Sequence, residues 1–117
     1  MANEANIADH LLTMRKHVLR LAEEANERDE PAMVYFIAPI EGGPVKIGTT
    51  KNINQRLATI QNSSPLPLHL ISCAPGDRDL ETSLHAMFHT ERLHGEWFEP
   101  SNWLLGIAAE FADRWTG

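Results

Sequence analysis

Apolar residues recur near the start of the chain at alternating steps of four and three positions. They are Ile7, Leu11, Met14, Val18, Leu21 and Ala25. This spacing is typical of the seam of a packed helix and predicts a helix over about 7–28. The acidic run "EEANERDEP" follows and contains Pro31, which ends a helix, and negative charge is also unfavourable at a helix C-terminus. We therefore divide the chain into 1–30, an N-terminal helix with an acidic linker, and 31–117, a single folded domain.

The next segment alternates short apolar runs with turn-forming residues. Strands are predicted over about 33–38 and 45–49, and "PIEGGP" joins them into a hairpin because glycine and proline suit a loop better than a strand interior. Asn52 is placed to cap a helix that has Gln55 at its third position. The apolar stripe of that helix consists of Ile53, Leu57 and Ile60.

The remaining sequence predicts one more strand and two helices. "LHLISCA" is the strand, and Asp77 or Asp79 begins a helix that "HGEWF" ends at Gly95. Pro100 and Ser101 start the terminal helix. The expected fold class is α/β (α+β): a small three-stranded, mainly antiparallel sheet flanked by helices, with an extra N-terminal helix.

Composition limits the functions that this fold can serve. The chain has 117 residues, 43% of them hydrophobic, which suits one domain with a modest core. The net charge of −6 argues against bulk electrostatic binding of nucleic acid, so any contact with DNA must use a local basic pocket. Cys73 is the only cysteine, which excludes an intramolecular disulfide and a cysteine-based zinc site. The sequence shows no signal peptide and no apolar run of ~20 residues, so we expect a soluble cytoplasmic protein without a membrane partner.

Five short motifs follow one another between about 33 and 99. They are "VYFI", "VKIGTT", an arginine in the next helix, "E…LH..F" and "GEWF". In this order they resemble the GIY-YIG nuclease superfamily, in particular its compact phage and prokaryotic branch. Met33 stands in place of the glycine of the first motif, and Lys46 in place of the tyrosine of the second. The resemblance implies a GIY-YIG-like domain over 31–117 that cleaves DNA phosphodiesters with Mg²⁺ or Mn²⁺.

The resemblance also implies a role for each matched residue. Tyr35 would assist the attacking water or act as base, Arg56 would stabilise charge on the phosphate, and Glu81 would be the sole protein ligand of the metal. Lys46 and Gly48 fall in the second motif. Lys46 would tune Tyr35, since a neighbouring ammonium group favours the phenolate, and Gly48 would permit close approach of substrate or backbone.

Apart from the family resemblance, each of these residues can be interpreted either as part of a catalytic site or as an ordinary structural residue. Phosphodiester hydrolysis needs a positioned water, a cation for the phosphoryl oxygens and usually a divalent metal, which Tyr35, Arg56 and Glu81 can supply. Equally, Tyr35 suits a half-buried strand position, Arg56 the surface of an amphipathic helix, and Glu81 the first turn of a helix. His85 lies one turn beyond Glu81, where the pair can share a metal or a water, and simple solvation is its alternative.

Substrate contacts and the hairpin register stay open at this point. Three basic residues, Lys51, Arg78 and Arg92, can track a phosphate backbone or can simply be solvated. A hairpin that pairs Tyr35 with Lys46 puts both side chains on one face, and a register slip by an even number of residues separates them while keeping that face.

We therefore expect a metal-dependent DNA endonuclease of the GIY-YIG type. The main alternative is a non-catalytic module of the same fold that binds nucleic acid or protein, which the acidic balance and the altered second motif favour. A structural dimeric adaptor is a third. The seam from Ile7 to Ala25 is expected either to cover its own domain or to pair with a second copy as a homodimer.

Overall fold

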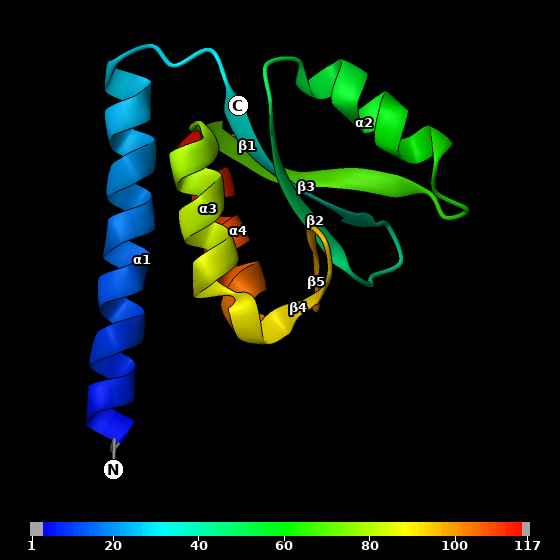
Figure 1. Ribbon diagram of the computed structural model, residues 1–117. Coiled ribbons are helices and arrows are strands. Elements are labelled where there is room, and N and C mark those ends of the chain that lie inside the picture. The colour runs from blue at the N-terminus through cyan, green and yellow to red at the C-terminus, as the bar shows by residue number, and fades with distance from the viewer. Residues whose placement is uncertain (1–3, 116–117) are drawn as a thin grey trace.

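The computed structural model describes residues 4–115, which form a five-stranded sheet with helices on both faces (Figure 1). In chain order the elements are α1 (Glu4–Glu27), β1 (Met33–Pro39), β2 (Val45–Thr50), α2 (Ile53–Asn62), β3 (Leu68–Pro75), α3 (Arg78–Met87), the 3₁₀ helix η1 (His89–Glu91), β4 (Arg92–His94), β5 (Trp97–Phe98) and α4 (Asn102–Trp115). The strand order is β3-β1-β2-β5-β4, and each neighbouring pair is antiparallel.

The predicted α+β class is confirmed, but the sheet has five strands rather than three. The predicted helix ending at Gly95 is wrong, because α3 ends at Met87 and the chain then forms η1 and the β4–β5 hairpin. Gly95 adopts φ +57° between those two strands. A glycine with positive φ serves a tight turn as well as a helix end, so this residue by itself did not distinguish the two.

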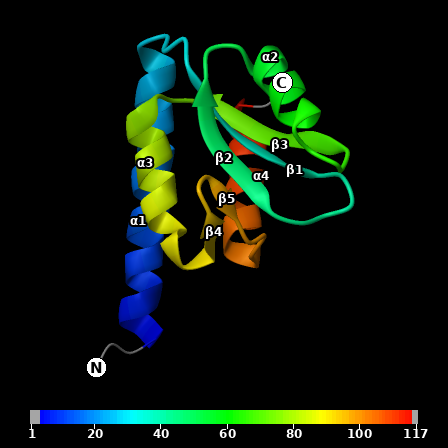
Figure 2. The ribbon, with the colours of Figure 1, turned by 45° about the vertical axis from the view of Figure 1, so that its right-hand side comes forward.

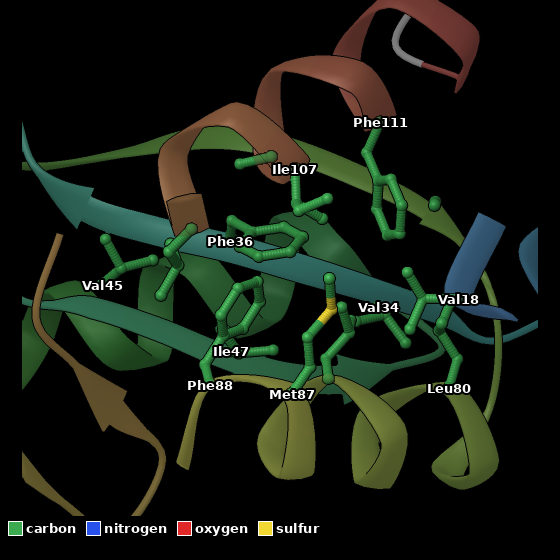
Figure 3. Close-up of a cluster of buried hydrophobic side chains, with 14 of the residues drawn as sticks. Val18, Val34, Phe36, Val45, Ile47, Leu80, Met87, Phe88, Ile107 and Phe111 are labelled. Atoms are coloured by element: carbon green, nitrogen blue, oxygen red, sulfur yellow. The ribbon is translucent and has the colours of Figure 1, made fainter. Parts of the chain in front are cut away.

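Alternating side chains of β1 separate two hydrophobic layers. Val34, Phe36 and Ala38 face the layer formed with α1, α3 and α4, where Phe36 and Phe111 pack edge to face (Figure 3). Tyr35 and Ile37 face the opposite side, which α2 covers. Of the site residues described below, Tyr35, Gly48 and Lys46 therefore lie on the α2 face of the sheet, whereas Thr49, which pairs with Val34, lies on the α3 face.

The helix α2 begins as the sequence predicts. The Asn52 side chain accepts a hydrogen bond from the Gln55 amide at 3.0 Å, and the stripe through Ile60 packs against the sheet. The cap fixes where the helix starts, and thereby the position of Arg56 in its first turns.

The N-terminal helix lies along α3 in both ribbon views (Figures 1 and 2). Val18 and Ala22 are buried in the main core, and Arg15 forms an ion pair with Glu110 of α4. The C-terminal half of α1 therefore covers its own domain, whereas Ile7 is 51% exposed. Pairing with a second copy through the exposed end stays a prediction.

Length and hydropathy of the helices bear on membrane insertion. Over residues 4–115, no helix is both long enough and apolar enough to cross a bilayer.

Candidate active site

Tyr35 lies in the middle of the sheet, with its ring on the α2 face and only 1% of the residue exposed. Gly48 lies directly opposite on β2. A Cβ atom at position 48 would be 2.3 Å from the Tyr35 hydroxyl oxygen and 2.6 Å from Cζ, so the phenol lies across the backbone of Gly48 and requires glycine there. The space that we expected Gly48 to leave for substrate or backbone is taken by the Tyr35 side chain.

Lys46 lies on the same face as Tyr35 but pairs with Ile37. The hairpin register is thus offset by two residues from one that pairs Lys46 with Tyr35, and the shared face is kept. The Lys46 ammonium forms an ion pair with Glu96, with Nζ 3.1 Å from Oε1, and lies 5.4 Å from the centre of the Trp97 ring. Its charge is balanced by Glu96.

The edge of β2 beyond β5 is occupied by side chains of α3. β5 has two residues and pairs with the first two residues of β2. Further along, His85 Nε2 donates a hydrogen bond to the carbonyl oxygen of Ile47 at 3.0 Å, and Glu81 Oε1 accepts one from the Thr49 hydroxyl at 2.6 Å. Both side chains of α3 are therefore fixed along the β2 edge.

His85 is held in a structural position. A carbonyl oxygen can only accept, so Nε2 carries the proton of this hydrogen bond and is committed to the backbone. The imidazole also packs on Phe98, with ring centres 5.0 Å apart. We therefore assign His85 to positioning α3 against β2, which differs from the expectation that it shares a metal with Glu81.

A cavity of about 400 Å³ opens beside Glu81. Its charged walls are Lys51, Arg78, Glu81 and Glu96, and the Thr49 and Thr50 side chains also line it. A second, polar hollow of about 250 Å³ adjoins it through Thr50 and is lined by Arg56 and the first turns of α2. The two hollows together form a polar surface that runs from α3 across the end of β2 to α2.

Of the predicted phosphate-binding residues, Arg56, Lys51 and Arg78 lie at this surface and Arg92 does not. Arg56 is exposed on α2 and lines the smaller hollow, and Lys51 lines the larger cavity. Arg92 lies on β4, where its Nε donates a hydrogen bond to the Gly95 carbonyl at 2.8 Å. The structure thus gives Arg92 a role in the β4–β5 turn.

The electrostatics of Tyr35 differ in sign from the sequence-based expectation. Burial raises the pKa of Tyr35 to about 12, the carboxylates of Glu96 and Glu81 act in the same direction, and Arg56 opposes them. Lys46, which was expected to favour the phenolate, is paired with Glu96, and the net shift of the Tyr35 pKa is in the opposite direction. At neutral pH Tyr35 keeps its proton, so it can donate a hydrogen bond but is a poor base.

The donor set of the cavity fits a hard divalent cation. In the described part of the chain, no three His, Cys, Asp or Glu side chains converge on one point. Mg²⁺ does not require such a cluster, because it commonly keeps several waters and binds one or two carboxylates together with substrate phosphate oxygens. Glu81 is a carboxylate of this kind, and Glu96 on the cavity wall is a second.

Sequence reasoning missed two residues of the site: Thr49 and Glu96. Thr49 lacked any signal beyond ordinary polarity. Glu96 had one, since it follows Gly95 within "GEWF", but we interpreted that segment as a helix end followed by core residues. Pairing of β5 with β2 is what brings Glu96 to Lys46.

Comparison with known proteins gives one match, to the family model described as the T5orf172 domain, over residues 32–116. No curated protein and no solved structure matches the chain. The matched range begins after α1 and contains all the residues that line the cavity. Because the model covers most of the sequence, the chain belongs to the T5orf172 domain family.

Proposed function

We propose that the protein is a metal-dependent DNA endonuclease of the GIY-YIG type, as the T5orf172 domain is generally regarded as GIY-YIG-related. The observation that carries this proposal is the polar surface that runs from Glu81 on α3 across the end of β2 to Arg56 on α2. Tyr35 lies across Gly48 of β2, and the charges of Arg56 and Glu81 both affect its pKa. A carboxylate and a guanidinium group thus line one polar surface near a tyrosine, and phosphodiester hydrolysis can use such a set.

The cationic side chains would bind the DNA backbone. Arg56 is exposed beside Tyr35 and would contact the oxygens of the scissile phosphate, while Lys51 and Arg78 on the cavity wall would hold a neighbouring phosphate. Such a local arrangement would let a chain with a net charge of −6 bind DNA.

Glu81 would hold Mg²⁺ or Mn²⁺, with the Thr49 hydroxyl fixing the carboxylate through its hydrogen bond. When bound, the cation supplies positive charge at the phosphoryl and leaving oxygens. Tyr35, protonated at neutral pH, would orient the attacking water by a hydrogen bond. Hydrolysis forms a P–O bond to the water oxygen and breaks the P–O bond to the sugar oxygen, and solvent takes the proton of the water and returns one to the leaving oxygen.

Metal-dependent nicking of supercoiled plasmid and of a panel of branched and single-stranded oligonucleotides tests this function. Glu81→Gln should abolish cleavage and leave the fold intact, since the amide oxygen can still accept from Thr49 but lacks the charge that a hard cation needs. Glu41→Gln, in the exposed loop between β1 and β2, is the matched control and should cut normally. Unchanged cleavage by folded Glu81→Gln would refute the assignment.

A non-catalytic binding module remains the second candidate, and one observation favours it. Lys46 is neutralised by Glu96 and Tyr35 holds its proton, so the tyrosine cannot serve as a base at neutral pH. Such a module should retard DNA in a mobility assay without cutting it in any divalent metal. Arg56→Gln should then weaken retardation, because the phosphate contact is common to both functions.

A further inference from the structure

Glu96 and Glu81 line the same cavity from different elements of the chain. Glu96 lies between β4 and β5, whereas Glu81 lies in the first turn of α3, and both line the same 400 Å³ space. The Glu96 side chain is 39% exposed, so solutes have access to its carboxylate. Two carboxylates from separate elements therefore border one solvent-filled space.

The position of Glu96 is fixed by both its backbone and its side chain. Its carbonyl oxygen accepts a hydrogen bond from the Ile47 amide at 3.0 Å, and its carboxylate forms the ion pair with Lys46. A carboxylate offers about four acceptor positions, so an ion pair with one ammonium group leaves capacity for a second cation. Lys46 thus holds Glu96 in place without exhausting its acceptors.

The Tyr35 hydroxyl lies near Glu96 and gives an independent sign of a bound ligand. In the described chain it has no hydrogen-bond partner, although Tyr35 is only 1% exposed. Both the hydroxyl oxygen and Glu96 Oε1 approach the backbone of Gly48: a Cβ there would lie 2.3 Å from the first and 3.1 Å from the second. Among described residues, Ser72 Oγ is the side-chain atom that is sealed from solvent and unpartnered, so the Tyr35 hydroxyl is not completely sealed. A water or phosphate oxygen bound at the site would supply the missing acceptor.

We propose that Glu96 and Glu81 bind the divalent cation together, and that the Lys46 ammonium group occupies Glu96 while the cation is absent. The choice of Mg²⁺ or Mn²⁺ rests on the proposed nuclease function, but the binding itself does not require cleavage. Two carboxylates with water molecules and phosphate oxygens form a common site for such an ion. The competing explanation is that Glu96 only neutralises Lys46.

Binding of Mn²⁺ to the full chain, followed by electron paramagnetic resonance of the free ion without DNA, separates the two explanations. Glu81→Gln and Glu96→Gln should each weaken Mn²⁺ binding by about tenfold or more, since even an outer partner of a metal ligand typically contributes that much. Glu99→Gln, three residues further on and exposed, should bind as the wild type does. Circular dichroism checks that each variant is folded.

Lys46→Met provides a second measurement with a sign that a purely neutralising role does not predict. It should bind Mn²⁺ more tightly, because Glu96 then has no competing ammonium group. Equal Mn²⁺ affinity in Glu96→Gln and wild type, or no binding by wild type, overturns the inference.

The plasmid-nicking assay distinguishes this failure from failure of the nuclease proposal. If the protein binds Mn²⁺ through both carboxylates but cuts no DNA, the two-carboxylate site is supported and the nuclease proposal is refuted. If the protein cuts DNA but its Mn²⁺ affinity depends on Glu81 alone, the nuclease proposal stands and the two-carboxylate site is refuted.

Discussion

Tyr35 is the only tyrosine of the chain, so the ultraviolet absorbance of tyrosinate reports on this one side chain. Its pKa is raised from 10.0 to about 12, first by burial and then by Glu96. In the unfolded chain the phenol should titrate near its ordinary value of about 10. Between these values the folded protein holds a proton that the unfolded chain has lost, so the free energy of unfolding falls as pH rises through this window.

The size of the effect follows from the shift. One pKa unit corresponds to about 1.4 kcal/mol, so the full contribution of Tyr35 is about 3 kcal/mol, complete below about pH 10 and lost by about pH 12. At about pH 11 the unfolded phenol is mostly ionised and the folded one mostly neutral. The loss there should already be about 1 kcal/mol.

Urea unfolding of wild type and Tyr35→Phe at a series of pH values from about 9 to 11 measures this contribution. Other groups titrate in the same range, but they do so in both proteins, so the difference isolates the phenol. Wild type should lose about 1 kcal/mol more than Tyr35→Phe over that range. Parallel curves for the two proteins, or a tyrosinate midpoint at or below about 10, would refute the reasoning.

Two charge substitutions test the causes separately. Glu96→Gln removes a negative charge that stabilises the neutral phenol, so the tyrosinate midpoint should fall. Arg56→Gln removes the opposing positive charge, so the midpoint should rise. A general change in stability would not shift the tyrosinate midpoint in opposite directions in these two variants. If both variants move the midpoint in the same direction, the electrostatic explanation fails.

Two further predictions concern packing. Gly48→Ala should destabilise the fold by about 1–3 kcal/mol, because the methyl group would lie 2.3 Å from the Tyr35 hydroxyl. Gly106→Ala, on α4 with open space around it, should instead stabilise the fold by about 0.5–1 kcal/mol. Urea unfolding compares the two variants, and equal effects would contradict the close approach of Tyr35 to Gly48. Val18→Glu should unfold the protein because Val18 is 1% exposed, whereas Leu12→Glu, at a 46% exposed position, should change stability by at most about 0.5 kcal/mol. If light scattering shows a dimer that Leu12→Glu dissociates, α1 has a second role as a dimer contact.

The parts of the fold that the sequence predicts well are those whose signals are local. The β1–β2 hairpin forms where glycine and proline separate two apolar runs, and the Asn52 cap forms with Gln55 as its spacing requires. The seam of α1 is likewise confirmed as a buried face from Val18 onward. Each of these features is determined by neighbours within a few positions.

The β4–β5 hairpin was not predictable in this way. Strands of three and two residues are too short to show a periodic pattern, and β5 pairs with β2, about fifty positions earlier in the chain. Because the hairpin was not predicted, Glu96 was not recognised as a site residue: the pairing of β5 with β2 is what brings it to Lys46. The register was undetermined for a related reason: an even slip keeps every side chain on its face, so hydrophobic pattern alone cannot fix it.

The departure from the second motif and the missed glutamate are physically linked. The Lys46 side chain is 19% exposed, and an ammonium group removed this far from water is stable only with a partner, which Glu96 provides. Lys46 therefore cannot act on Tyr35 or on a phosphate as a free positive charge while Glu96 holds it. A direct role for Lys46 requires that another cation take over Glu96, and a divalent ion shared with Glu81 would do this. Under that condition the lysine expected to tune Tyr35 becomes available only after the metal has bound.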